Sequence, residues 1–111
     1  MEFIITEYKH CDLIKILGRI DSYSTRLINE ALQELIVDEH LNIVVDMGEV
    51  SYISSSGILL FVHLQKQIKR LNRGEIVFTN VPKLVYSSFE LSGFHQLFEF
   101  YNDVVSAVGR F

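Results

Sequence analysis

Apolar and polar positions alternate along the N-terminal part of the chain. Residues 3–9 and residues 13–20 follow this alternation, and the polar segment His10-Cys11-Asp12 separates them. A period of two is typical of a strand that places one face on a core, and a short polar connection between two such strands favours a hairpin. We therefore predict a β-hairpin over residues 3–20, whose first strand lies at the edge of a sheet.

Beyond the hairpin, amphipathic segments alternate with short apolar runs. Apolar residues at helical spacing predict helices, and runs without polar alternation, such as Ile43-Val44-Val45, predict strands covered on both faces. The predicted helices run from Asp21 or Ser22 to Ile36, from the serines at 54–56 to Leu71, from Pro82 to Gly93, and from Asn102 to Val108. The predicted strands cover residues 41–47, 75–79 and 97–101. Asn72-Arg73-Gly74 is expected to end the second helix.

This order of elements indicates the class of fold. Strands that alternate with helices imply a parallel sheet, to which the hairpin adds one antiparallel edge. The chain has 111 residues, which is enough for one core and too few for two. We predict a single α/β domain over residues 1–111, with a mixed, mostly parallel sheet, an antiparallel edge strand and about four helices.

The charge pattern argues against a nucleic-acid partner. The chain carries 10 basic and 14 acidic residues, a formal charge of -4. The densest basic group, Lys66, Lys69, Arg70 and Arg73, spreads over the polar side and end of one predicted helix, which is usually a solvated face. Binding of nucleic acid generally requires a basic stripe, and none is evident.

The N-terminus and the single cysteine indicate a compartment. Cys11 is alone, so a disulfide framework is excluded, and residues 1–7 lack the basic start and apolar length of a signal peptide. A membrane span needs about 18 consecutive apolar residues, and the sequence has no such run. We expect a reduced, cytoplasmic protein without direct membrane insertion.

The sequence offers little for catalysis or for metal binding. The four histidines, at positions 10, 40, 63 and 95, show no ligand spacing, with or without Cys11. A serine hydrolase would need Gly-x-Ser-x-Gly at a strand-to-helix turn, and Ser54-Ser55-Ser56-Gly57 lacks the first glycine. We therefore predict no catalytic residue, no metal and no cofactor.

The serine run itself follows the buried strand and opens a helix. Serines at a helix start commonly serve as caps, because a hydroxyl accepts a hydrogen bond from a free N–H group of the first turn. On the residues alone, Ser54 or Ser55 is the cap and Ser56 is simply small. Asp21 has the same interpretation at the start of the first helix, and Asp46 is expected to bind N–H groups of the following segment.

Four short motifs occur along the chain in a fixed order. They are Gly18-Arg19-Ile20-Asp21, then Ile43-Val44-Val45-Asp46-Met47 with Val50-Ser51-Tyr52-Ile53, then Ser54-Ser55-Ser56-Gly57-Ile58, and finally Phe89-Glu90-Leu91-Ser92-Gly93-Phe94. With the order of elements, they resemble the STAS domain, the family of bacterial anti-sigma factor antagonists. The family has Gly-x-Leu-Asp, Asp-Ser-Ser-Gly-Leu and Phe-x-x-Ser-Gly-Leu at the first, third and fourth motifs. The resemblance covers nearly the whole chain.

The resemblance implies a phosphorylation switch at Ser56. In the family, the serine before the glycine is phosphorylated by a partner kinase that is also an anti-sigma factor. The unphosphorylated antagonist binds this kinase, the phosphorylated form releases it, and a phosphatase restores binding. The chain departs from the family at Ser54, which replaces the usual Asp and leaves the acceptor hydroxyl in place.

The same resemblance implies a partner-binding surface around the acceptor. We expect it to include Asp21, Ser22, Ser54, Ser55 and Gly57, the last because a glycine leaves room for a kinase active site. The alternative function is a non-switching STAS scaffold or accessory subunit, of a signalling assembly or of a lipid transporter. A serine-dependent enzyme is a remote third alternative, and the oligomeric state is left open.

Overall fold

The chain begins with the predicted hairpin. The computed structural model describes residues 1–71 and 73–111. Strand β1 spans Glu2–Glu7 and pairs antiparallel with β2, Asp12–Ile20. The backbone N–H of Tyr8 donates to the carbonyl of Cys11 at 2.9 Å and closes the connection. Because β1 is the first strand in the order of the sheet, it forms an edge, as predicted.

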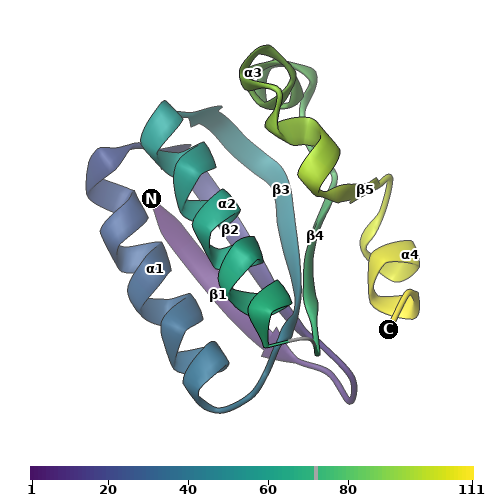
Figure 1. The fold of residues 1–111 in the computed structure, drawn as a ribbon. Coiled ribbons are helices and arrows are strands. Elements are labelled where there is room, and N and C mark those ends of the chain that lie inside the picture. Colours follow the sequence, from purple (N-terminus) through teal and green to yellow (C-terminus); the bar gives the residue numbers. More distant parts are fainter. Residues whose placement is uncertain (72) are drawn as a thin grey trace.

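The sheet has the order β1-β2-β3-β4-β5, so its strands lie side by side in chain order (Figure 1). Strand β3 spans Asn42–Ile53, β4 spans Glu75–Thr79 and β5 spans Glu99–Tyr101. These strands and β2 pair in parallel, while β1 alone among the described strands runs the other way. The mixed, mostly parallel sheet with an antiparallel edge is confirmed.

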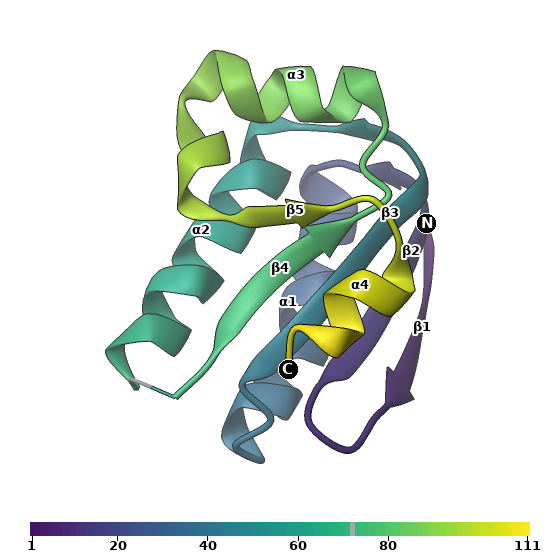
Figure 2. The ribbon, with the colours of Figure 1, turned by 90° about the vertical axis from the view of Figure 1, so that its right-hand side faces the viewer.

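Helices cover both faces of this sheet. Helices α1, Ser22–Val37, and α2, Ser55–Arg70, lie together on one face, and α4, Val104–Gly109, lies on the other (Figure 2). Helix α3, Lys83–Ser92, packs near the carboxyl end of β3. Within the described residues, no helix is both long and apolar enough to cross a membrane.

The larger core fills the space between the sheet and α1, α2 and α3. Its centre is Phe78 on β4, whose ring centroid lies 5.2 Å from that of Phe61, 5.2 Å from that of Phe89 and 4.8 Å from that of Phe98. Edge-on and tilted contacts of this kind add to the free energy gained from burial alone. A smaller core, with Val44, Val77 and Ala107, lies under α4.

Strand β3 is longer than predicted. The prediction ended it at Met47, but the strand runs to Ile53, and Val50 and Ile53 are buried in the larger core. The β2–β3 pairing contains two register shifts, between Lys15 and Leu17 and between Gly18 and Arg19. These shifts break the period of two, so the buried positions Met47, Val50 and Ile53 fall three residues apart. In the sequence, residues 48–53 therefore resemble a loop.

Several smaller boundaries also differ from prediction. Helix α3 begins at Lys83 with Pro82 as its N-cap, and α4 is capped by Asp103, whose carboxylate accepts the N–H of Ser106 at 2.7 Å, and not by Asn102. A 3-10 helix, Phe94–Leu97, precedes β5, which therefore begins later than expected. Helix α2 ends one residue before Leu71, and Asn72 of the predicted stop lies outside the described residues.

Candidate functional site

The carboxyl ends of β2 and β3 bring two helix starts together. Ile20 is the last residue of β2 and pairs with Ile53, the last residue of β3. The backbone N–H of Ser54 then donates to the carbonyl of Ile20 at 2.8 Å, which ties the two exits from the sheet to each other. Helices α1 and α2 therefore begin side by side, at the sheet edge where open α/β folds place their functional segments.

Asp21 holds the start of α1. Its Oδ1 accepts the N–H groups of Tyr23, at 3.1 Å, and Ser24, at 3.0 Å, while the Ser24 hydroxyl oxygen accepts the N–H of Asp21 at 2.8 Å. This reciprocal capping box satisfies free N–H groups of the first turn. The hydrogen bond from Ser24 N–H is the main reason that the pKa of Asp21 lies below its usual range. Asp21 is thus an ionised cap, beside the exposed Ser22.

Ser54 holds the start of α2. Its Oγ accepts the N–H of Gly57 at 3.1 Å, so Ser54 is the N-cap, and Ser55 is the first helical residue. The hydroxyl oxygens of Ser54 and Ser56 lie 2.8 Å apart and share a hydrogen bond. Ser55 and Ser56 are exposed, whereas Ser54 is half-buried. The acceptor predicted by resemblance therefore stands in the first turn of α2 and faces solvent.

Gly57 is buried, and its environment gives a different reason for a glycine than the one inferred from the sequence. A Cβ at this position would lie 2.8 Å from Cγ2 of Ile20 and 2.8 Å from Cγ1 of Ile53. Both distances are too short for a real contact, so a side chain would push α2 away from the ends of β2 and β3. The glycine allows close packing of the helix, which in turn sets where Ser56 stands.

Two surface grooves adjoin the serines. One, of about 510 Å³, lies between α1 and α2, and its lining includes Ser56, Arg26 and His63. The other, also about 510 Å³, lies between α2 and α3, and its lining includes Ser55 and the exposed Leu91. The exposed side of α2 at this end is therefore bordered by a groove with a mixed polar and apolar lining that includes Arg26, and by a more apolar groove.

Comparison with known proteins settles the family. The family model of the STAS domain matches residues 2–107. The chain belongs to the STAS domain family. The anti-sigma-B factor antagonist of Listeria monocytogenes is 30% identical over 93 residues, which cover 84% of this chain and 80% of that protein.

Solved STAS structures share the fold of this domain. The anti-sigma factor antagonist SpoIIAA in its unphosphorylated form superposes with a TM-score of 0.85 at 18% identity, over 98% of this chain and 95% of that one. The phosphorylated form of SpoIIAA, a Bacillus cell fate determinant, superposes with a TM-score of 0.77 at 16% identity, over 98% of both chains. At these identities the likeness concerns the fold alone.

Asp46 has the structural role in this STAS domain that the sequence predicted. Its Oδ1 accepts the N–H of Gly48 at 3.0 Å and also the side-chain amide of Asn80 at 3.3 Å. Asp46 is buried, so these hydrogen bonds compensate for the loss of water around its carboxylate. It supports the middle of β3, away from the serines.

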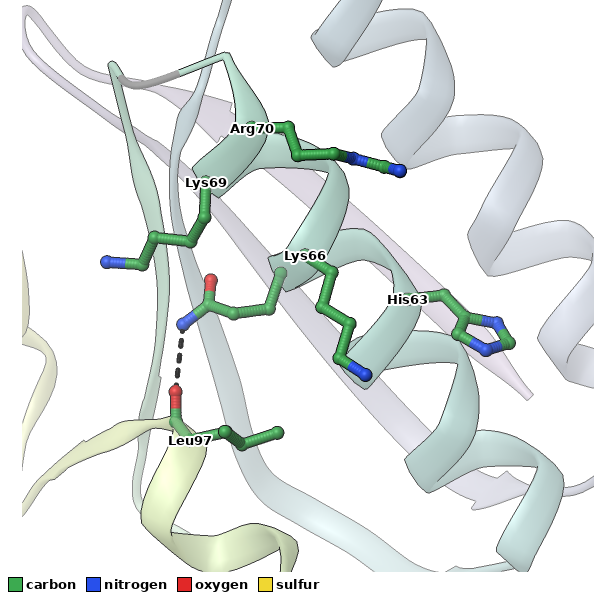
Figure 3. Close-up of a pocket in the computed structure, with 6 residues that line it drawn as sticks. His63, Lys66, Lys69, Arg70 and Leu97 are labelled. Atoms are coloured by element: carbon green, nitrogen blue, oxygen red, sulfur yellow. Dashed lines mark hydrogen bonds between the residues drawn. The ribbon is translucent and has the colours of Figure 1, made fainter.

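The basic residues of α2 do not form a converging site. A cavity of about 590 Å³ at the far end of the helix is lined by His63, Gln65, Lys66, Lys69, Arg70 and Leu97. Figure 3 shows Lys69 and Arg70 pointing to opposite sides of α2. Nζ of Lys69 lies 3.8 Å from Oε1 of Glu75. Because the cations diverge, they form a solvated face of the STAS domain, as predicted from their spacing.

Proposed function

We propose that this STAS domain is an anti-sigma factor antagonist of the cytoplasm, whose binding to a partner is switched by phosphorylation of Ser56. The observation that carries the proposal is the exposed hydroxyl of Ser56 in the first turn of α2, beside the capped start of α1. The names of the curated relatives support the antagonist role. The two solved states of SpoIIAA support a phosphorylated form of this fold.

The chemistry of phosphorylation requires only an acceptor from this chain. Ser56 Oγ attacks the γ-phosphorus of ATP held by an anti-sigma factor serine kinase, and the bond from that phosphorus to the β-phosphate oxygen breaks. The hydroxyl proton passes to a base of the kinase, and ADP leaves. The kinase also supplies the metal ion, so the antagonist itself need not be an enzyme. A phosphatase returns Ser56 to its hydroxyl form.

The phosphate acts as a local electrostatic switch. It adds a charge of about -1.5 to -2 at the start of a helix, where free N–H groups and the helix dipole favour negative charge. The fold therefore tolerates the modification. A docked partner does not, because a desolvated or like-charged group at an interface costs several kcal/mol, and about 3 kcal/mol lowers affinity roughly a hundredfold.

The partner-binding surface in this proposal surrounds Ser56. Ser22 and Ser55 are exposed, and Asp21 and Ser54 are half-buried, so these four residues offer polar groups to a partner from two adjacent helix starts. Gly57 contributes through packing, because it is buried. The apolar groove between α2 and α3 extends this surface with Leu59 and Leu91.

Intact mass tests the acceptor. Each anti-sigma factor serine kinase of the source organism is incubated with ATP and the wild type, Ser56→Ala or Ser55→Ala. We expect one added phosphate on the wild type and on Ser55→Ala, and none on Ser56→Ala. A phosphate on Ser56→Ala would assign the site elsewhere, and no phosphate on any protein would favour the scaffold or accessory role.

Binding tests the switch. Ser56→Asp should bind the same kinase much more weakly than the wild type does, with little change in melting temperature, because a carboxylate in the first turn suits a helix start. Calorimetric titration with the kinase measures the first quantity, and a thermal scan measures the second. If Ser56→Asp unfolds instead, the exposed placement of this residue is wrong.

A further inference from the structure

The turn of the hairpin places two carboxylates opposite each other. Glu7 ends β1, Asp12 begins β2, and the two residues are partners in the register of the antiparallel pair. Residues directly opposite each other in such a pair project from the same face, and like charges there are destabilising. The side chain of Asp12 is only 5% exposed, which makes its charge costly without a compensating cation.

His40 approaches both carboxylates from a third segment, which connects α1 to β3. Its Nδ1 lies 2.9 Å from Oδ2 of Asp12 and 3.8 Å from Oε2 of Glu7. The three ligand atoms all lie within 4.8 Å of one another. The histidine spacing in the sequence gave no sign of this cluster, since its members come from three segments. The hairpin register was the signal that could have paired Glu7 with Asp12.

We propose that Glu7, Asp12 and His40 form a binding site for a divalent transition cation, with Zn²⁺ as the ion best matched to these donors. Zinc takes histidine nitrogen and carboxylate oxygen at about 2.0–2.2 Å, and tetrahedral geometry then separates ligand atoms by about 3.3–3.6 Å. Nδ1 of His40 lies 2.9 Å from Oδ2 of Asp12 and 3.8 Å from Oε2 of Glu7, on either side of this range, and the ligand atoms of Glu7 and Asp12 lie within 4.8 Å of each other. Binding of the ion therefore requires side-chain rotation, which the exposed Glu7 allows.

The donor set also argues against the harder cations. Mg²⁺ and Ca²⁺ prefer sites made of oxygen ligands, and Mg²⁺ keeps most of its water. A site with one imidazole and two carboxylates favours zinc or a neighbouring transition metal. A polar cavity of about 470 Å³ opens over the cluster, and its lining includes His10 and Asn42. It gives a cation a path from solvent and leaves room for a bound water as the fourth ligand.

Such an ion would join the hairpin to the segment between α1 and β3. Because the three ligands come together only in the folded chain, binding stabilises the native state by mass action. The cluster lies at the amino-terminal end of β2, and Ser56 follows the carboxyl ends of β2 and β3. The proposal is therefore independent of phosphorylation.

Titration of chelator-treated protein with ZnCl₂ tests the site. Calorimetry should give one ion per chain for the wild type, and about a tenfold excess over the dissociation constant should raise the melting temperature by about 5 °C. His40→Gln should lose both effects. The matched control is His63→Gln, which removes an exposed histidine from α2 and should bind as the wild type does.

A second variant, Glu7→Gln, tests the site even if His40→Gln folds poorly. The side chain of Glu7 is 72% exposed, so Glu7→Gln should fold normally. Loss of a group that only hydrogen-bonds a metal ligand costs about 10- to 100-fold in metal affinity, so loss of a direct ligand should cost at least about tenfold. Zinc binding that is unchanged in Glu7→Gln, or absent from the wild type, would overturn the proposal. As a control for the choice of metal, MgCl₂ should leave the melting temperature of the wild type unchanged.

Discussion

The hydroxyl oxygens of Ser54 and Ser56 lie 2.8 Å apart in the first turn of α2. The STAS motif that the chain resembles has Asp at the position of Ser54. The carboxylate of such an Asp would repel a phosphate on Ser56, whereas a serine hydroxyl is neutral and can donate a hydrogen bond to it. In the proposed switch, Ser54 would therefore suit a phosphate on Ser56 better than an Asp would.

This pair of residues predicts a shift in the second pKa of the phosphate. With phosphoserine incorporated at position 56 during synthesis, Ser54→Asp should raise this pKa by about 0.7 pH unit, since two charges about 4 Å apart in water repel by about 1 kcal/mol. A ³¹P NMR titration measures the value without any kinase. Ser106→Asp, on α4 across the sheet, is the control. Equal pKa values in Ser54→Asp and the wild type would contradict the prediction.

Gly57→Ala should destabilise the domain. The added Cβ would lie 2.8 Å from stiff, β-branched parts of Ile20 and Ile53, so we expect a loss of about 1–3 kcal/mol in the free energy of unfolding. Urea denaturation measures it. Gly109→Ala on α4 is the matched control, because a Cβ there meets nothing within 4 Å among the described residues. Equal stability of the two variants would mean that α2 can shift at little cost.

Gln65→Leu should also destabilise, through unpaired backbone groups. The side chain of buried Gln65 accepts the N–H of Ile76 at 2.7 Å and donates to the carbonyls of Ile76, at 3.2 Å, and Leu97, at 3.1 Å. On the β5 side of β4, Gln65 takes the place of a strand partner for Ile76, because the pairing with β5 begins only at Val77. We expect the free energy of unfolding to fall by about 1–3 kcal/mol, which urea denaturation measures. The control is Lys66→Gln at the exposed neighbouring position, which should leave this free energy nearly unchanged.

Asp21 should make α1 sensitive to acid. Its pKa is lowered in the folded state, mainly by the N–H of Ser24, so its contribution is fully present above the unfolded pKa of about 3.9 and is lost as the pH falls through the folded value. Asp21→Asn should therefore melt below the wild type at pH 7, and the difference should shrink toward pH 3. A difference that stays constant across this range would exclude the ionised cap.

The elements with strong periodicity could be predicted, and the end of β3 shows where periodicity stops being informative. The helices α1 and α2 and the strand β4 have unbroken apolar patterns, and their positions were predicted closely. Residues 48–53 continue a strand through two register shifts in its pairing with β2, and a shift of register leaves no local mark in the sequence. Only the pairing of β2 with β3 shows that Val50 and Ile53 face the core.

At the candidate site, only the structure shows which serine caps α2 and why residue 57 is a glycine. Ser54 and Ser55 are equally good caps by residue type, and the distance from Ser54 Oγ to the N–H of Gly57 decides between them. The need for a glycine depends on Ile20, which is far away in the sequence and next to it in space. Ser56 was identified by resemblance, because a hydroxyl in a run of serines has no pattern of its own.

The strands occupy the sheet in the order in which they occur in the chain. During synthesis, each strand can therefore add beside the one made before it, and no later strand has to insert between two earlier ones. The segments that position Ser56, from β2 to the start of α2, leave the ribosome before β4, β5 and α4 do. In a nascent chain, the segments that position Ser56 can therefore come together before the sheet is complete.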